Sequence, residues 1–203
     1  YKFILLNFWL MRNNIVILFG YSGSLKSEMT KSIGEKYGLR IIHPPTILRG
    51  LYNEGKTNTL ISTKGFWESE EGIKLSKRRL KEDSLDLKLD EMLLEEIRRG
   101  DVVMDSYTMP WLTKEGIKIN LRSSLQERAN RAARQNNFSP EKIRKLIKEN
   151  DSMSRRIFRN LYDFDIMEDL DVFDYAIKPE HGILGGFKKI CYYLNKMGFK
   201  PIK

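Results

Sequence analysis

The segment Ile15-Val-Ile-Leu-Phe19-Gly20-Tyr-Ser-Gly-Ser-Leu-Lys26-Ser27 decides the fold of this chain. Its first five residues are all apolar, which predicts a buried strand at 15–19. The Gly- and Ser-rich turn that follows leads into a helical stretch at 26–36, which Gly38 closes. Residues 20–27 follow the pattern G-x-x-x-x-G-K-[ST] at every position except Leu25. In that pattern, backbone N–H groups cradle phosphate oxygens at a helix N-terminus.

The residues of this loop predict a nucleotide site. Lys26 would reach the β- and γ-phosphates, and the Ser27 hydroxyl would hold Mg²⁺. Leu25 replaces a glycine, and a left-handed backbone at that position would cost a leucine roughly 1–2 kcal/mol. The alternative interpretation is an ordinary strand–turn–helix junction with an exposed lysine. The candidate ATP-binding residues of the loop are Gly20, Tyr21, Ser22, Gly23, Ser24, Leu25, Lys26 and Ser27.

Further strands and helices alternate along the rest of the chain. Strands are expected at 39–43, 101–105, 116–121 and 173–177. Helices are expected at 46–53, 68–99 with a break near 83–84, 124–136, 140–162 and 184–196, and a loop at 55–66. This alternation predicts an α/β protein whose parallel sheet has helices on both faces.

Composition excludes several function classes. The chain has 203 residues, which suits one domain, and we expect that domain to cover 11–203. Cys191 is its single cysteine and it has two histidines, so disulfide scaffolds, cysteine-based zinc sites and His-rich metal chemistry are excluded. The 36 Lys and Arg residues exceed the 27 Asp and Glu residues and give a net charge of +9, which favours polyanionic partners.

The first ten residues, YKFILLNFWL, are apolar but too few to cross a bilayer, which takes about 20. We interpret 1–10 as an N-terminal extension or an upstream reading of the gene, with a weak signal peptide as the alternative. No apolar run elsewhere approaches a membrane span. We therefore expect a cytoplasmic protein with no membrane partner, and a monomer.

Three residues outside the loop are candidates for substrate contacts. Arg49, just after the second strand, would clamp a second phosphate, although an isolated arginine on a helix usually faces water. Asp105 ends the third strand, where it would hold Mg²⁺ or orient an acceptor; capping the next turn is the alternative. Trp111 would stack on a base or pack in the interior, and packing is the default.

Basic residues recur along two neighbouring helices. Arg128, Arg131 and Arg134 follow one another at intervals of three residues. The next helix carries Arg144, Lys148, Arg155, Arg156 and Arg159. Such a stripe is a solvated face, an RNA-phosphate contact, or a lid whose arginines neutralise a phosphoryl group in transfer. Beside a phosphate loop, the lid interpretation gains weight.

Taken in order, these features resemble the nucleoside monophosphate kinases, and more closely the archaeal-type cytidylate kinase family. The resemblance runs from about residue 15 to the C-terminus. Its most specific pieces are Gly65-Phe-Trp-Glu68, Gly100-Asp-Val-Val-Met-Asp-Ser-Tyr-Thr-Met-Pro-Trp-Leu112, Ser124-Leu-Gln-Glu-Arg128 and Phe173-Asp174.

The resemblance implies a three-layer P-loop kinase fold with a five-stranded parallel sheet, a helical monophosphate-binding insertion at 46–99 and a lid at about 134–156. It implies transfer of the γ-phosphate of ATP to CMP or dCMP, with Mg²⁺ at Ser27 and Asp105. The catalytic residues would be Lys26, Arg131, Arg155 and Arg156, with Arg128 on ATP. The monophosphate side would comprise Arg49, Asp105, Tyr107 and Trp111.

Three residues depart from that family's pattern. Leu25 replaces the loop glycine, and Tyr107 stands where many relatives place a second monophosphate-binding arginine. Glu149 falls near an expected basic lid residue. These departures leave open the acceptor and two further hypotheses: a weak or inactive nucleotide- or RNA-binding protein on the same scaffold, and an ATPase or small-molecule kinase of related fold.

Overall fold

The computed structural model describes residues 14–52, 70–136, 139–179 and 182–202. The extension expected at 1–10, the loop expected at 55–66 and the segment 65–68 lie outside the described residues. So does residue 53, the last of the helix expected at 46–53.

Five parallel strands form one sheet in the order β2-β3-β1-β4-β5. The strands are β1 (Ile15–Phe19), β2 (Arg40–Ile42), β3 (Val102–Asp105), β4 (Ile117–Leu121) and β5 (Tyr175–Ile177). Because all five run the same way, their carboxyl ends meet at one edge of the sheet. The predicted fold class is confirmed.

The central strand β1 is buried along its whole length because helices cover both faces of the sheet. Val16 and Leu18 belong to a core shared with α2 (Lys26–Tyr37) and α9 (Gly182–Lys196). Ile15 and Ile17 point the other way, into a core that includes Leu89 of α5 (Ser84–Arg98). The alternation of strand side chains thus gives this continuous apolar run two separate cores.

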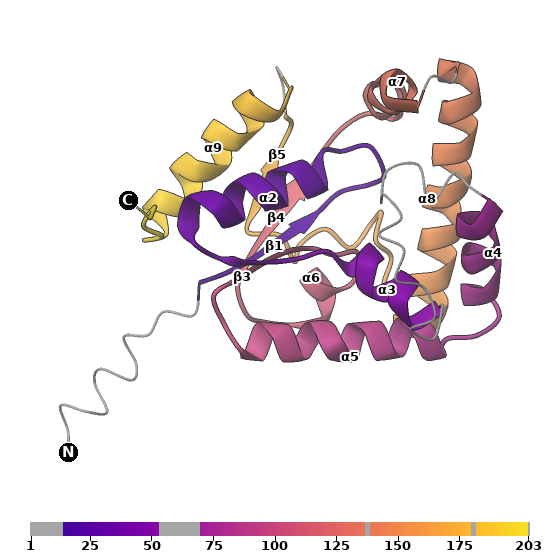
Figure 1. The fold of residues 1–203 in the computed structure, drawn as a ribbon, viewed down its shortest axis with the longest axis horizontal. Helices are drawn as coiled ribbons and strands as arrows, with labels where there is room; N and C mark the ends of the chain where they lie inside the picture. The colour runs from indigo at the N-terminus through magenta and orange to yellow at the C-terminus, as the bar shows by residue number, and fades with distance from the viewer. Residues whose placement is uncertain (1–13, 53–69, 137–138, 180–181, 203) are drawn as a thin grey trace.

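Figure 1 shows the layers that result: α2 and α9 cover one face of the sheet, and α5 and α6 lie across the other. The remaining helices gather toward the carboxyl edge, and α7 packs against α8. The bounds not yet given are α3 (Pro44–Tyr52), α4 (Glu70–Arg79), α6 (Met109–Leu112), α7 (Leu125–Asn136) and α8 (Pro140–Tyr162). None of the helices in the described ranges combines the length and apolarity that spanning a membrane takes.

The amphipathic pattern of α8 explains how this helix packs at the carboxyl edge of the sheet. The Ser139 side chain accepts a hydrogen bond from the backbone N–H of Lys142 at 3.3 Å, and Pro140 fits the first turn. Ile143 and Ile147 face α7 in an apolar cluster. Further along, Phe158 enters an aromatic cluster around Phe19, the last residue of β1.

Small differences from the predicted elements have local causes. Helix α3 begins at Pro44, two residues before its expected start, because proline fits the first helical turn. The four-residue helix α6 was not predicted, since one turn is too short to display a helical period. The break expected near 83–84 falls between α4 and α5.

Candidate active site

The loop at residues 20–27 wraps the N-terminus of α2 at the carboxyl edge of the sheet. Its turn is closed by a hydrogen bond from Ser24 N–H to the Tyr21 carbonyl at 3.0 Å. A Cβ on Gly20 would lie 2.4 Å from Ser24 Oγ, and a Cβ on Gly23 would lie 3.0 Å from the Arg128 carbonyl oxygen. Gly23 also has a φ of 77°. Both glycines are therefore required by space, and Gly23 by conformation as well.

Leu25 adopts the backbone that a glycine would favour. Its φ is 70° and its ψ is 22°, in the left-handed region, and its residue exposure is 8%. The Leu25 carbonyl still accepts the N–H of Met29 at 3.0 Å, so α2 starts normally. The loop thus keeps its shape with leucine in it, at a conformational cost of roughly 1–2 kcal/mol.

Lys26, Ser27 and Asp105 converge beneath the loop. The Lys26 ammonium donates to the Tyr21 carbonyl at 3.2 Å, which holds it across the mouth of the loop. The Ser27 hydroxyl donates to Asp105 Oδ2 at 3.0 Å, joining the start of α2 to the end of β3. Burial lowers the pKa of Lys26, and the nearby Asp105 carboxylate partly opposes that shift.

His43 adds a residue that the sequence did not single out. It follows β2, so it lies at the same sheet edge, and its Nδ1 is 3.3 Å from Asp105 Oδ1. The hydrogen bond to Asp105 raises the pKa of His43. The position of His43 after a strand was the available signal, because ligands of parallel sheets gather at this edge.

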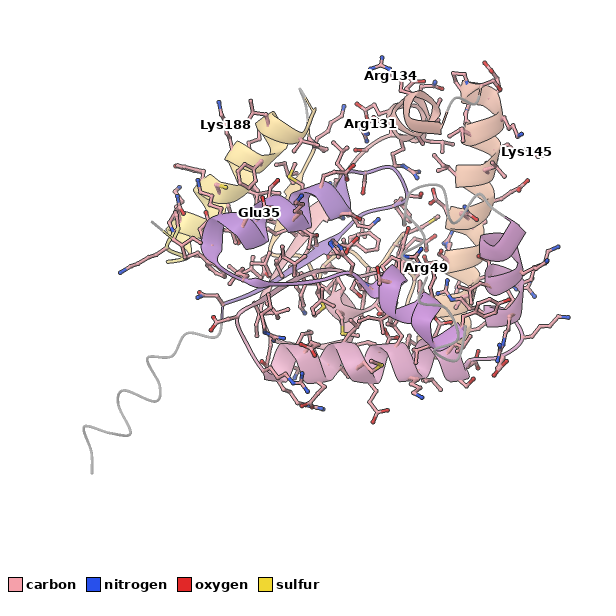
Figure 2. All side chains as sticks on the ribbon, viewed as in Figure 1. Glu35, Arg49, Arg131, Arg134, Lys145 and Lys188 are labelled. Carbon is pink, nitrogen blue, oxygen red and sulfur yellow. The ribbon has the colours of Figure 1, made fainter. Side chains whose placement is uncertain are left out.

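Two arginines of α7 fasten the hairpin of α7 and α8 to the loop. Arg128 donates to the Ser22 carbonyl at 3.1 Å, and Arg131 donates to the Gly23 carbonyl at 2.8 Å. Arg128 also donates to Asp151 Oδ2 of α8 at 2.7 Å, and both side chains are buried. Burial raises the pKa of Asp151, and the Arg128 pair partly opposes this. Arg134 and Lys145 instead point outward (Figure 2).

Several buried polar atoms around the loop have no hydrogen-bond partner among the described residues. They are Ser24 Oγ, Arg128 Nε, Arg131 Nη2, Asn150 Nδ2 and Asp151 Oδ1. A buried polar atom without a partner destabilises a folded protein, and a water molecule, an ion or a ligand would each satisfy it. The two arginine nitrogens suit an anion, which agrees with the phosphate-binding geometry of the loop.

Asp151 was also missed in the sequence, although a signal existed. It stands four residues after Ile147, which itself stands four after Ile143, so a carboxylate occupies the apolar face of an amphipathic helix. A charge in that position needs a partner, and Arg128 is its partner.

The other two predicted catalytic arginines, Arg155 and Arg156, make no hydrogen bond to the loop among the described residues. Arg155 donates to Asp165 at 2.8 Å and also pairs with Glu168, both in the segment after α8. Its bond holds the pKa of Asp165 below the ordinary value. Arg156 is exposed, and so is Glu149.

Among the residues predicted to bind the monophosphate, Arg49 of α3 is half-buried and donates to the Pro45 carbonyl at 3.2 Å (Figure 2). Trp111 stacks on Phe164 with ring centroids 4.9 Å apart, and its indole N–H donates to the Asp169 carbonyl at 2.8 Å. Trp111 therefore packs against the aromatic cluster around Phe19. Tyr107 lies closer to the loop, with its ring against Lys26.

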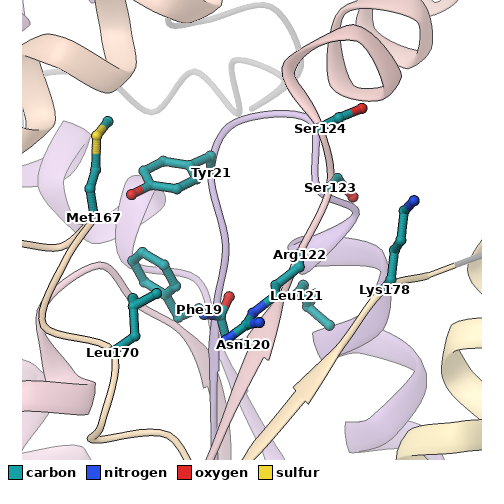
Figure 3. A pocket seen from close by; sticks show the side chains of 10 residues that line it. All are labelled: Phe19, Tyr21, Asn120, Leu121, Arg122, Ser123, Ser124, Met167, Leu170 and Lys178. Carbon is teal, nitrogen blue, oxygen red and sulfur yellow. The ribbon is translucent and has the colours of Figure 1, made fainter.

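A cavity of about 370 Å³ opens beside the loop (Figure 3). Phe19, Tyr21, Met167 and Leu170 lie together on one side of it. Its remaining wall comes from the ends of β4 and β5, and that wall comprises Asn120, Leu121, Arg122, Ser123, Ser124 and Lys178. The cavity is thus mostly apolar with a few polar groups, as small-molecule sites are.

Solved structures that share this fold include shikimate kinases. The chain resembles shikimate kinase from Acinetobacter baumannii with a TM-score of 0.54 and 17% identity, over 95% of this chain and 98% of that one. It resembles an uncharacterized protein from Eubacterium ventriosum with a TM-score of 0.58 and 13% identity, over 91% and 99% of the two chains. Identities this low concern the fold alone. Fold and loop together define the class: the chain has the fold of the P-loop kinases.

Its sequence relatives define the family. The chain is 31% identical over 165 residues to a cytidylate kinase of Ignicoccus hospitalis, covering 80% of this chain and 88% of the relative. It is 27% identical over 190 residues to a cytidylate kinase of Pyrococcus horikoshii, covering 91% of each. No family model matches the chain. The chain belongs to the cytidylate kinase family, a group of nucleoside monophosphate kinases, as its sequence motifs predicted.

Proposed function

We propose that this protein transfers the γ-phosphate of ATP to a pyrimidine nucleoside monophosphate, CMP or dCMP, with Mg²⁺. One observation carries the proposal: Ser27 of the loop is hydrogen-bonded to the strand-end Asp105 at 3.0 Å, beside the Lys26 ammonium. A hydroxyl, a carboxylate and an ammonium at one helix N-terminus are the groups that phosphoryl transfer needs. The cytidylate kinase relatives support CMP as acceptor.

The donor end of the reaction rests on the loop. Its backbone N–H groups and the positive end of α2 attract phosphate oxygens, and Lys26 adds a full charge at the mouth of the loop. Arg128 and Arg131 approach from α7 and carry unpartnered donors there. Together these cations would neutralise the charge that spreads over the transferring phosphoryl group.

The oxygen donors at Ser27 and Asp105 fit Mg²⁺. This ion prefers oxygen ligands and is usually held by one or two carboxylates together with substrate phosphates and water. The described residues contain no group of three or more acidic, His or Cys side chains that would hold a metal alone. When bound, the ion supplies charge neutralisation at the phosphates.

The acceptor side would use Arg49, whose planar guanidinium suits a phosphate dianion. Its role in this chain is to bind and orient the monophosphate, so that the acceptor oxygen faces the γ-phosphorus in line. Burial lowers the pKa of Arg49, but its ordinary value is so high that the side chain stays charged. No strong base is needed for a reaction of this class, which depends on positioning and electrostatics.

The cavity beside the loop is our candidate for the base of the donor nucleotide. Tyr21 and Phe19 offer aromatic walls for a heterocycle, and Asn120 offers an amide for its polar edge. Its volume of about 370 Å³ is in the range of small-molecule pockets.

The test is an ADP-release assay with ATP, Mg²⁺ and each nucleoside monophosphate in turn. We expect ADP release that depends on CMP or dCMP, is lost in Lys26→Ala and is kept in Lys31→Ala. Lys31 is a matched control because it lies on the same helix but is exposed and pairs with Glu35 at the surface. ADP release without any acceptor would indicate an ATPase instead, and silence with every acceptor would refute kinase activity.

One observation favours the second candidate, a nucleotide- or RNA-binding protein without turnover. Leu25 imposes conformational strain on the loop and places a buried side chain in it. This candidate predicts binding that needs no ATP turnover and, for RNA, weakens steeply with added salt. Turnover that appears only in Leu25→Gly would show that the leucine disables the loop.

A further inference from the structure

Lys26 has an aromatic neighbour that the phosphate-loop pattern does not include. Its Nζ lies 4.9 Å from the centre of the Tyr107 ring, within the range of a cation–π interaction. Within the described part of the chain, the Tyr21 carbonyl is its single hydrogen-bond partner, although an ammonium has three donors. The ring face therefore adds to the attraction that the Tyr21 carbonyl and the nearby Asp105 and Asp151 carboxylates exert on this ammonium.

The Tyr107 ring is itself held in a fixed orientation. It meets the ring of Phe19 edge-on at 5.9 Å and stacks on Phe158 of α8 at 5.9 Å. The backbone on either side is tied down by Ser106 Oγ, which accepts the N–H groups of Thr108 and Met109 at 3.2 and 3.1 Å. A ring held this way offers its face to Lys26 without losing further freedom when a nucleotide binds.

An arginine at this position would act differently. It would add a second cation beside Lys26, and like charges at close range repel each other. The tyrosine hydroxyl is neutral at pH 7, and burial raises its pKa further. A neutral ring at residue 107 can therefore hold the Lys26 ammonium, which serves the ATP side of the site. It has no charge with which to bind the phosphate of an acceptor.

We propose that Tyr107 is a positioning residue for Lys26, holding the ammonium at the mouth of the phosphate loop through its ring face. The inference rests on the proposed function, since it assigns Lys26 to the phosphates of ATP. It moves residue 107 from the acceptor side to the donor side of the reaction.

The experiment compares Tyr107→Phe, Tyr107→Leu and Tyr107→Arg with the wild type. ATP·Mg²⁺ affinity is measured by calorimetry, and kcat and KM are measured for both substrates. Tyr107→Phe keeps the ring and should match the wild type. Tyr107→Leu and Tyr107→Arg should lose about tenfold in kcat/KM for ATP, and in Tyr107→Leu the KM of the acceptor should be unchanged.

Phe173→Leu is the matched control, because Phe173 packs on Phe19 in the same aromatic cluster but does not lie over Lys26. It should lower the thermal midpoint as much as Tyr107→Leu does while keeping the ATP parameters of the wild type. Equal ATP parameters in the Phe and Leu variants, or an effect confined to acceptor KM, would overturn the inference. So would a gain in turnover in Tyr107→Arg, or loss of ATP affinity in Phe173→Leu.

Failure of the inference is distinguishable from failure of the proposed function. If the wild type turns over CMP and the variants do not differ in ATP parameters, the kinase stands and the role of Tyr107 falls. If no acceptor is turned over but ATP affinity drops in Tyr107→Leu and holds in Tyr107→Phe, the role of Tyr107 stands and the kinase falls. A wild type that binds no ATP overturns both.

Discussion

The Tyr162 hydroxyl, at the last residue of α8, donates a 2.5 Å hydrogen bond to the buried Asp90 carboxylate of α5. The other oxygen of Asp90 accepts the Thr108 hydroxyl at 2.6 Å. One carboxylate thus links the end of α8, the helix layer under the sheet and the loop that follows β3. Asp86 lies near it and is paired in turn with Arg79 of α4.

This link predicts an unusual pH dependence of stability. Burial, with a contribution from Asp86, raises the pKa of Asp90 from its ordinary value of 3.8 to about 6. The folded protein therefore binds this proton more tightly than the unfolded chain, and stability falls as pH rises from about 4 to 6. Asp90→Asn removes the titration, so its stability relative to wild type should improve by on the order of 3 kcal/mol from pH 4 to 7.

Denaturant unfolding at both pH values measures this difference. Glu91→Gln is the control, because Glu91 is the exposed neighbour of Asp90 on the same helix. It should show no such change with pH. A constant difference between wild type and Asp90→Asn would contradict the prediction.

Two substitutions at Leu25 separate the cost of its left-handed backbone from the contribution of its buried side chain. Leu25→Ala removes the buried side chain and keeps the positive φ, whereas Leu25→Gly removes the side chain and relieves the strain. Relief of the left-handed strain stabilises the glycine variant, whereas the greater freedom of glycine in the unfolded chain destabilises it. The net free energy of unfolding of Leu25→Gly should exceed that of Leu25→Ala by about 1 kcal/mol. Thermal unfolding of the two variants measures this difference in stability. An alanine variant as stable as the glycine variant would contradict a strained loop.

The pair of Arg128 and Asp151 should stabilise the junction between the loop and the hairpin of α7 and α8. Asp151→Ala leaves the buried Arg128 charge without its carboxylate, which should cost on the order of 3 kcal/mol in the free energy of unfolding. Glu149→Ala, two residues away but exposed, should stay within about 0.5 kcal/mol of wild type. Chemical denaturation of both variants gives the comparison, and similar losses in the two would argue against the pair.

The hydrogen bond between Ser27 and Asp105 places two oxygen ligands together, which predicts how the Mg²⁺ concentration needed for turnover responds to mutation. Ser27→Ala removes one oxygen donor, so the Mg²⁺ concentration for half-maximal ADP release should rise about tenfold or more. Ser152→Ala, on an exposed part of α8, should leave it unchanged. Chelation of Mg²⁺ should abolish turnover in all three proteins. An unchanged requirement in Ser27→Ala would exclude Ser27 as a ligand.

The order of elements was predictable from the chain because local patterns carried it. The apolar run before Gly20 is buried on both faces, and Ser139-Pro140 marks the start of α8 at the observed residue. The loop residues were predictable for the same reason, since their neighbours in space are also their neighbours in sequence. The metal-binding, acceptor and lid roles stay predictions.

Contacts across the fold were not predictable in this way. Arg155 and Arg156 stand next to one another, yet the partner of Arg155 is Asp165, in a segment without regular structure after α8. No periodicity fixes the path of such a segment. The aromatic neighbours of Trp111 and Tyr107 likewise include Phe19 of β1 and Phe158 of α8. More than a hundred residues of sequence lie between Phe19 and Phe158.

The close approach of Gly23 to the Arg128 carbonyl limits how the molecule can move during a reaction cycle. Because Arg128 is bonded to the Ser22 carbonyl and Arg131 to the Gly23 carbonyl, we expect the first turns of α7 to move together with the phosphate loop. Substrate entry and product release would then leave these contacts assembled between turnovers.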